Sequence, residues 1–155
     1  MPGDTHHILI VCTGNICRSP MAEYLLRDYA AIRGKRVEVK SASMIGLDGK
    51  PAHKNAIRAM KEVGIDITAH RAQPISSELV EWADWILGME IQHAARLRES
   101  YPGADEKIML LGTYGGLVEV DDPLGGWRWK FRASRKDIKR CVDTFVDRLP
   151  SSSSS

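Results

Sequence analysis

Cys12 begins a short run of residues whose types suit chemistry on a phosphate group. The run Cys12–Ser19 reads Cys-Thr-Gly-Asn-Ile-Cys-Arg-Ser and places Arg18 six positions after Cys12. A thiol with an ordinary pKa near 8.5 is only about 3% ionised at pH 7, so a cysteine nucleophile needs surroundings that stabilise its thiolate. Backbone N–H groups, a helix N-terminus and a fixed guanidinium can supply them together. The segment predicts a phosphate-binding loop with a nucleophilic thiolate.

The residues on either side of this loop predict a strand and a helix that hold it. His7–Val11 ends in a continuous aliphatic run typical of a buried strand. Pro20 suits the first turn of a helix, and apolar residues recur at helical spacing from Met21 to Ile32. We expect Ser19 to cap this helix, so that the N–H groups of the loop converge on an anion.

Several loop residues have expected roles toward the phosphate. Arg18 can hold two phosphoryl oxygens, and the Ser19 hydroxyl can hydrogen-bond the Cys12 sulfur. Gly14 allows a backbone conformation closed to most other residues. A buried structural cysteine is the alternative, but the flanking strand and helix favour the catalytic interpretation. The remaining residues of the expected phosphate site are Thr13, Asn15, Ile16 and Cys17.

This sequence resembles the low-molecular-weight protein tyrosine phosphatase family. The family signature Cys-x-Gly-Asn-x-Cys-Arg-Ser-Pro is matched at every fixed position from Cys12 to Pro20, and the resemblance extends from about Ile8 to Leu149. It implies a metal-free, cofactor-free phosphatase that forms a phosphocysteine intermediate. Its expected ligands are phosphotyrosine-containing proteins, with inorganic phosphate or similar oxyanions bound at the Cys12 loop.

The resemblance also assigns residues outside the loop. Asp122, which precedes Pro123, matches the general acid that protonates the leaving phenolate. Asp121 could compete for that role by sequence alone, and without the cysteine motif this segment would be a surface turn. Ser41 and His70, together with Asn15, match positions that hold the loop in shape through side-chain hydrogen bonds.

Substrate specificity is the point on which the sequence departs from the family pattern. Residues 44–49 contain no aromatic side chain, and Leu124 follows Pro123, where the family usually has aromatic residues that contact the phenyl group. The similar bacterial protein-arginine phosphatases, which typically carry threonine at the position of Ile16, are therefore the nearest alternative. Isoleucine suits a phenyl ring better than a polar guanidino group, which favours tyrosine. A non-catalytic phosphate-binding module is a third hypothesis, but binding alone requires neither Cys12 nor Asp122.

The cysteines indicate a reducing compartment. The chain has three cysteines and no evident signal peptide, so we expect a cytoplasmic protein without structural disulfides. The resemblance implies that Cys12 and Cys17 form a reversible disulfide that protects Cys12 from over-oxidation. Cys141 fits the apolar side of a C-terminal helix. The arsenate reductases that resemble this family need further cysteines, and residues 18–140 contain none.

Length and composition predict one α/β domain over residues 1–150, followed by a disordered serine tail over 151–155. Charge is nearly balanced, with 22 basic and 20 acidic residues in 155, so no nucleic-acid partner is expected. No apolar run reaches the ~18 residues of a membrane span. Strands and helices alternate, which together with the resemblance predicts a three-layer fold with a four-stranded parallel sheet and helices on both faces, flavodoxin-like or phosphotyrosine phosphatase I-like. The expected strands are His7–Val11, Arg36–Ser41, Trp85–Gly88 and Lys107–Leu111, and the expected helices are Pro20–Arg33, Ala52–Val63, Ser76–Trp82, Glu90–Ser100 and Phe131–Leu149.

Trp127–Arg132 is a basic and aromatic segment close to Asp122. We interpret it as a solvated helix start with long side chains; the alternative is a docking rim for acidic phosphopeptides or an acidic membrane surface. The five histidines show no spacing typical of metal ligands, so no metal is expected.

Overall fold

A parallel β-sheet forms the centre of the structure, a computed structural model that describes residues 5–46 and 48–150. Within these residues the sheet has four strands in the order β2-β1-β3-β4. The strands are β1 (His6–Cys12), β2 (Val37–Ser43), β3 (Trp85–Gly88) and β4 (Ile108–Leu110). The expected architecture is confirmed, whereas the predicted tail at residues 151–155 lies outside the described part of the chain.

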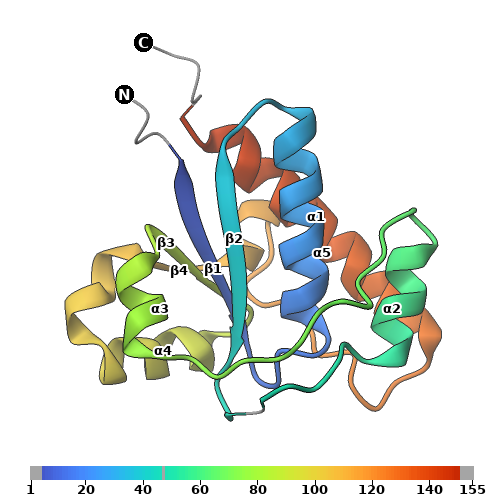
Figure 1. Ribbon diagram of the computed structural model, residues 1–155, viewed down its shortest axis with the longest axis horizontal. Helices are drawn as coiled ribbons and strands as arrows, with labels where there is room; N and C mark the ends of the chain where they lie inside the picture. The colour runs from blue at the N-terminus through green and yellow to red at the C-terminus, as the bar shows by residue number, and fades with distance from the viewer. Residues whose placement is uncertain (1–4, 47, 151–155) are drawn as a thin grey trace.

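Helices cover both faces of this sheet (Figure 1). Ile8 and Ile10 of β1 belong to the core shared with α1 (Arg18–Ile32), α2 (Lys54–Lys61) and α5 (Arg128–Arg148). Leu9 and Val11 belong to the core shared with α3 (Ser77–Trp82) and α4 (Ile91–Ser100). Successive strand residues face opposite sides, so the continuous aliphatic run of β1 is what a strand buried on both faces requires.

All five α-helices within the described residues start one to three residues away from the prediction, and α1 and α5 begin earlier than expected. Helix α1 begins at Arg18, with Cys17 at the N-cap position and no side-chain cap found among the described residues. The predicted Ser19 cap is wrong, because the Ser19 hydroxyl is engaged by Cys12 and Asn15 instead. Helix α5 begins at Arg128, three residues before the predicted Phe131, which is fully buried and stacks on the His53 ring.

The remaining elements lie close to their predicted bounds. Strand β3 has the predicted bounds, Trp85–Gly88. The Ser76 side chain caps α3 by accepting the backbone N–H of Leu79. Helix α4 starts one residue after the predicted Glu90, which occupies its N-cap position. Two short 3-10 helices, η2 (Pro102–Lys107) and η3 (Leu111–Gly115), lie before and after β4.

The carboxyl ends of the strands meet at one edge of the sheet, at the bottom of Figure 1. Cys12 is the last residue of β1 and pairs in register with Ser43, the last residue of β2. Val11 pairs with Gly88 at the end of β3. Ligands of open parallel sheets bind at this edge, so the fold places the Cys12 loop where a site is expected.

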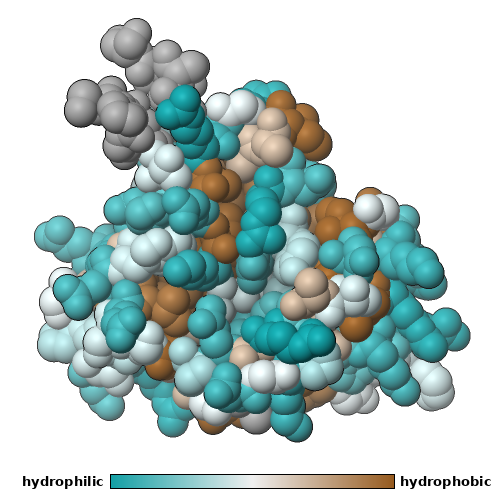
Figure 2. All heavy atoms as spheres, viewed as in Figure 1, coloured by the Kyte–Doolittle hydropathy of each residue, from teal (hydrophilic) through white to brown (hydrophobic). Residues whose placement is uncertain are grey.

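The face of the molecule seen in Figure 2 is mainly polar, and its apolar residues form small separate groups. One of these groups lies over α2. None of the helices within the described residues has the length and apolar character that crossing a bilayer requires.

Candidate active site

Cys12 lies at the start of the turn that connects β1 to α1. Cys12 is 2% exposed, and its sulfur accepts the backbone N–H of Asn15 across 3.3 Å. The Ser19 Oγ lies 2.9 Å from the same sulfur. Strand β1 and helix α1 therefore bring a backbone and a side-chain hydrogen-bonding group to one sulfur, as the sequence predicted.

Asn15 positions the Ser19 hydroxyl that lies next to the Cys12 sulfur. The Asn15 Oδ1 accepts the backbone N–H of Gln73 at 3.0 Å, which fixes the orientation of the amide. Its Nδ2 can only donate, and it donates to Ser19 Oγ at 2.7 Å. A thiolate sulfur has no hydrogen, so toward an ionised Cys12 the Ser19 hydroxyl is the donor, an arrangement that favours the thiolate.

Asn15 also carries the unusual backbone conformation of the loop. Its φ of 57° is left-handed, whereas Gly14 is not among the described residues with positive φ, so the special conformation expected at Gly14 belongs to its neighbour. Asparagine tolerates this conformation better than most residues. The His70 Nε2 donates to the Asn15 carbonyl at 2.7 Å, which holds the strained backbone in place.

Glu23, a partly buried residue on α1, completes this network. The Asn15 Nδ2 also donates to Ser41 Oγ at 2.9 Å, and Ser41 donates onward to Glu23 Oε1 at 2.5 Å. The Nδ1 of His70 lies 4.0 Å from the same Glu23 oxygen. Ser41 and His70 are thus brought together behind the loop, as expected, and Glu23 joins them.

Arg18 is almost completely buried, with 1% of its surface exposed. Its Nη1 donates to Glu90 Oε2 at 2.6 Å and to the Val120 carbonyl at 2.7 Å. Partial burial of Glu90 opposes its ionisation, but hydrogen bonds from Gln92 and Arg18 outweigh this and hold the pKa of Glu90 below its ordinary value. The guanidinium is therefore fixed from one side by a charged carboxylate.

Asp122 is connected to the Cys12 loop by its contact with Arg18. Its Oδ2 lies 3.6 Å from Arg18 Nη2, while its Oδ1 accepts the backbone N–H of Leu124 at 3.0 Å. The side chain is 39% exposed, so it can meet both a substrate and water. Asp121 is exposed and makes no ion pair within the described residues. The geometry thus brings Asp122, rather than Asp121, to the guanidinium.

Thr13 is held by His93, in the first turn of α4. The His93 Nδ1 accepts the backbone N–H of Glu90 at 3.1 Å, so a neutral ring carries its proton on Nε2. That nitrogen lies 3.0 Å from Thr13 Oγ1 and donates to it. Burial and the charge of Arg18 lower the pKa of His93, which favours the neutral ring. Among the described residues no group of histidine, cysteine, aspartate and glutamate side chains could hold a metal ion.

Comparison with known proteins identifies the family of this chain. The model of the family described as low molecular weight phosphotyrosine protein phosphatase matches residues 7–154. The chain belongs to this family. The match includes the whole Cys12 loop and Asp122.

Three relatives show how far the similarity extends. The low molecular weight protein-tyrosine-phosphatase Wzb of Escherichia coli (strain K12) is 40% identical over 93% of this chain and 95% of its own. A protein-arginine-phosphatase of Geobacillus stearothermophilus is 37% identical over 93% of this chain and 96% of its own. The structure of Vibrio vulnificus Wzb in complex with benzylphosphonate is 33% identical, with a TM-score of 0.85, and covers 93% of this chain and 99% of that one.

Within this phosphatase family fold, the two loop cysteines have different environments. Burial, followed by the neighbouring Cys12 and Asp122, raises the pKa of Cys17 to about 12, against the opposing effect of Arg18. Cys17 is therefore a thiol at neutral pH. Both cysteines are free in the structure, so the disulfide that the resemblance implies remains a prediction. Cys141 is buried in the core, as predicted.

The rim of the loop is aliphatic on the side of β2. The backbone N–H of Ile45 donates to the Thr13 carbonyl at 3.2 Å, which places residues 44–46 beside the loop. Ile45 and Leu124 are each 55% exposed, and Ile16 is half-buried. Leu47, which belongs to the same predicted rim, lies outside the described residues.

Four supporting residues of this phosphatase site escaped the sequence analysis. Glu90 and His93 follow the carboxyl end of β3, and Glu23 lies four residues after Ser19 on α1. The end of a parallel strand and the i+4 position on a helix are signals that could have found them. Gln73 contributes its backbone N–H to Asn15, which no side-chain pattern predicts.

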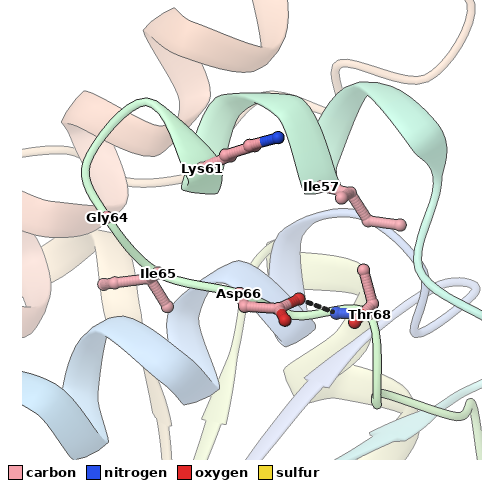
Figure 3. Close-up of a pocket in the computed structure, with 6 residues that line it drawn as sticks. All are labelled: Ile57, Lys61, Gly64, Ile65, Asp66 and Thr68. Carbon is pink, nitrogen blue, oxygen red and sulfur yellow. Dashed lines mark hydrogen bonds between the residues drawn. The ribbon is translucent and has the colours of Figure 1, made fainter.

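A cavity lined by residues of α2 and the following segment lies away from this site. It has a volume of about 370 Å³ and opens between α2 and the segment that follows it (Figure 3). Asp66 uses its carboxylate to accept the backbone N–H of Thr68, and Ile57 and Ile65 supply apolar walls. No residue of the Cys12 loop lines it, so its size does not mark it as the catalytic centre.

Proposed function

We propose that this phosphatase family member hydrolyses phosphotyrosine in proteins through a phosphocysteine intermediate on Cys12. The observation that carries the proposal is the Cys12 sulfur, which receives the N–H of Asn15 at 3.3 Å and the hydroxyl of Ser19 at 2.9 Å. Arg18 lies at the end of the same loop and is linked to Asp122 across 3.6 Å. A nucleophile, an anion clamp and an acid are thus within reach of one phosphoryl group.

In the first step the Cys12 thiolate attacks phosphorus. An S–P bond forms while the bond between phosphorus and the phenol oxygen breaks, and Asp122 gives its proton to that oxygen. The loop N–H groups and Arg18 stabilise the charge on the transferring oxygens. The Ser19 hydroxyl stabilises the sulfur as an anion both before the attack and in the next step, when sulfur is the leaving group.

In the second step water releases the phosphate. The Asp122 carboxylate left by the first step accepts a proton from a water molecule as that water attacks phosphorus. The S–P bond breaks, inorganic phosphate forms, and Cys12 returns as a thiolate. The exposure of Asp122 gives water access to the position from which this attack occurs.

Turnover of p-nitrophenyl phosphate tests this mechanism. Cys12→Ser should abolish it, and Asp122→Asn should slow it by about 10²–10⁴-fold. Asp105→Asn, which changes an exposed aspartate on η2, is the matched control and should leave the rate unchanged. Unchanged rates in both site variants, or phosphate binding without a burst of nitrophenol, would reject the mechanism and favour a non-catalytic binding module.

Phosphoarginine is the second candidate substrate. It is supported by the arginine phosphatase relative at 37% identity and by the aliphatic rim at Ile45 and Leu124. We favour tyrosine because Ile16 offers only apolar surface, and a guanidino N–H left against it would cost about 1–3 kcal/mol. Peptides that differ only in phosphotyrosine or phosphoarginine, tested on the wild type and on Ile16→Thr, decide between them. Higher wild-type kcat/KM on phosphoarginine would overturn the choice of tyrosine.

We also propose that the enzyme works in a reducing compartment such as the cytoplasm. The catalytic thiol must stay reduced to act, and Cys12, Cys17 and Cys141 are all free. Fractionation of cells that express the protein would test this.

A further inference from the structure

A cavity of about 230 Å³ lies beside Asp122, between the segment that carries this residue and helix α5. Asp122 forms part of its wall, so an occupant lies next to the group that we propose protonates the leaving oxygen. Small-molecule sites usually measure about 300–1,000 Å³, so this smaller space suits a single side chain. We call it the α5 cavity, and the polar and aromatic residues that line it are Asp121, Asp122, Trp129, Lys130, Ser134 and Asp137.

Ser134 leaves a hydrogen-bonding group unused in the wall of the α5 cavity. Its side chain is 5% exposed, and its Oγ has no hydrogen-bond partner among the described residues. Most buried hydroxyls in native proteins are paired, so each exception needs an explanation. A hydrogen-bonding group that enters the α5 cavity and displaces the atoms covering this Oγ would satisfy it.

The charge of the lining favours a cation. The carboxylates of Asp121 and Asp137 outnumber the single ammonium of Lys130, and Asp122 is not counted because the proposed mechanism needs it protonated when the substrate binds. Asp121 makes no ion pair within the described residues, and Asp137 has only a 3.5 Å contact with Arg140, in which both side chains are substantially exposed. Such an exposed pair holds its carboxylate weakly, so Asp137 is available to a competing cation.

The aromatic wall favours the same occupant. Trp129 is 59% exposed, although indole rings are usually well buried. The Lys130 ammonium lies 5.8 Å from the centre of this ring, which shows that a cation is tolerated over it. Lysine and arginine side chains combine an apolar stem with a cationic end, and both bind over tryptophan faces.

We propose that the α5 cavity binds a lysine or arginine side chain of the substrate, close in sequence to the phosphorylated residue. The inference rests on the proposed function and names the class of substrate: phosphoproteins with a basic residue beside the phosphosite. The ring of Trp129 receives the stem, while Asp137, Asp121 and the Ser134 hydroxyl receive the N–H groups. Acidic peptides, which the basic residues at the start of α5 would attract, are disfavoured by the carboxylates of Asp121 and Asp137.

Peptides with one phosphotyrosine test this inference. In an otherwise neutral sequence, arginine, glutamine or glutamate is placed in turn at each of the three positions on either side of the phosphotyrosine, and kcat/KM is measured. We expect arginine to exceed glutamine by about fivefold to tenfold at one or two positions, and glutamate to fall below both. Equal values for all three residues at every position, or a preference for glutamate, would overturn the proposal.

Variants connect the preference to the α5 cavity. The ratio of kcat/KM for the best arginine peptide and its glutamine counterpart, taken within each variant, cancels any general change in catalysis. Asp137→Asn and Trp129→Ala should each lower this ratio by at least about twofold. Asp143→Asn changes another α5 aspartate that pairs with a basic side chain on its own helix, and it should keep the wild-type ratio. A preference that survives both cavity variants would place the basic subsite elsewhere and overturn the assignment.

The two proposals fail in different ways. Loss of turnover on p-nitrophenyl phosphate, which has no flanking residues, would reject the catalytic mechanism itself. Turnover of that compound without any peptide preference would reject only the assignment of the α5 cavity. If Asp137→Asn does not fold, the surface variant Trp129→Ala still carries the test, because this ring is largely exposed.

Discussion

The Ser19 hydroxyl donates a hydrogen bond to the Cys12 sulfur, and the two atoms lie 2.9 Å apart. The hydroxyl is the donor toward a thiolate, which has no hydrogen of its own, and Asn15 Nδ2 donates to the same Ser19 oxygen. The side-chain amide of Asn15 thus positions the hydroxyl that stabilises the thiolate, although this amide does not contact the sulfur. Behind it, Ser41 and Glu23 continue the same chain of donors to a carboxylate.

Ser19→Ala should remove one donor from the thiolate without emptying the loop. A hydrogen bond to a charged group contributes about 1.5–3 kcal/mol, so kcat for p-nitrophenyl phosphate should fall by about 10- to 100-fold. Steady-state kinetics measure the change, and Ser100→Ala, at an exposed serine at the end of α4, is the control. A kcat equal to that of the wild type would show that the hydroxyl does not stabilise the sulfur.

Two substitutions at Asn15 separate its backbone from its side chain. Asn15→Gly loses the amide hydrogen bonds but accepts the φ of 57°. Asn15→Ala loses the same bonds and also strains the backbone by about 1–2 kcal/mol, which the greater flexibility of unfolded glycine partly offsets. We expect the alanine variant to be less stable than the glycine variant by about 1 kcal/mol in urea unfolding. The reverse order of stability would contradict the left-handed conformation.

Cys17 should make the protein sensitive to alkali. Its pKa is about 12 in the folded state, against about 8.5 for an unfolded thiol. The folded state therefore holds the proton more tightly, and this contribution to stability is complete below pH ~8.5 and is lost as the pH rises toward 12. Between pH 8 and 10 the wild type should lose about 1–2 kcal/mol more than Cys17→Ala. Urea unfolding under reducing conditions measures the loss, and parallel losses in the two proteins would contradict the buried thiol.

The sequence alone predicted the parts of the fold that local patterns encode. The aliphatic run before Cys12 predicted β1, and the spacing of apolar residues after Pro20 predicted most of α1. The start of α5 was missed because Trp127 and Trp129 are exposed and add no apolar periodicity. Basic residues near this helix start are offset in part by Glu62, which pairs with Arg132 from a distant segment.

The candidate site was predictable to the extent that its residues lie in one motif. Cys12, Arg18 and Ser19 follow from the loop itself. Glu90 comes from the loop after β3 and reaches Arg18 only because β1 and β3 are neighbours in the sheet. The role of Ser19 was half predicted, since its contact with Cys12 is confirmed and its capping of α1 is wrong.

The rate at which iodoacetamide alkylates Cys12, followed from pH 4 to 10 with each cysteine assigned by mass spectrometry, tests the central claim most directly. The account predicts that at pH 7 Cys12 is alkylated much faster than Cys17 and Cys141, whose pKa values burial raises. Alkylation of Cys12 at pH 7 that is no faster than that of Cys17 and Cys141 would contradict it.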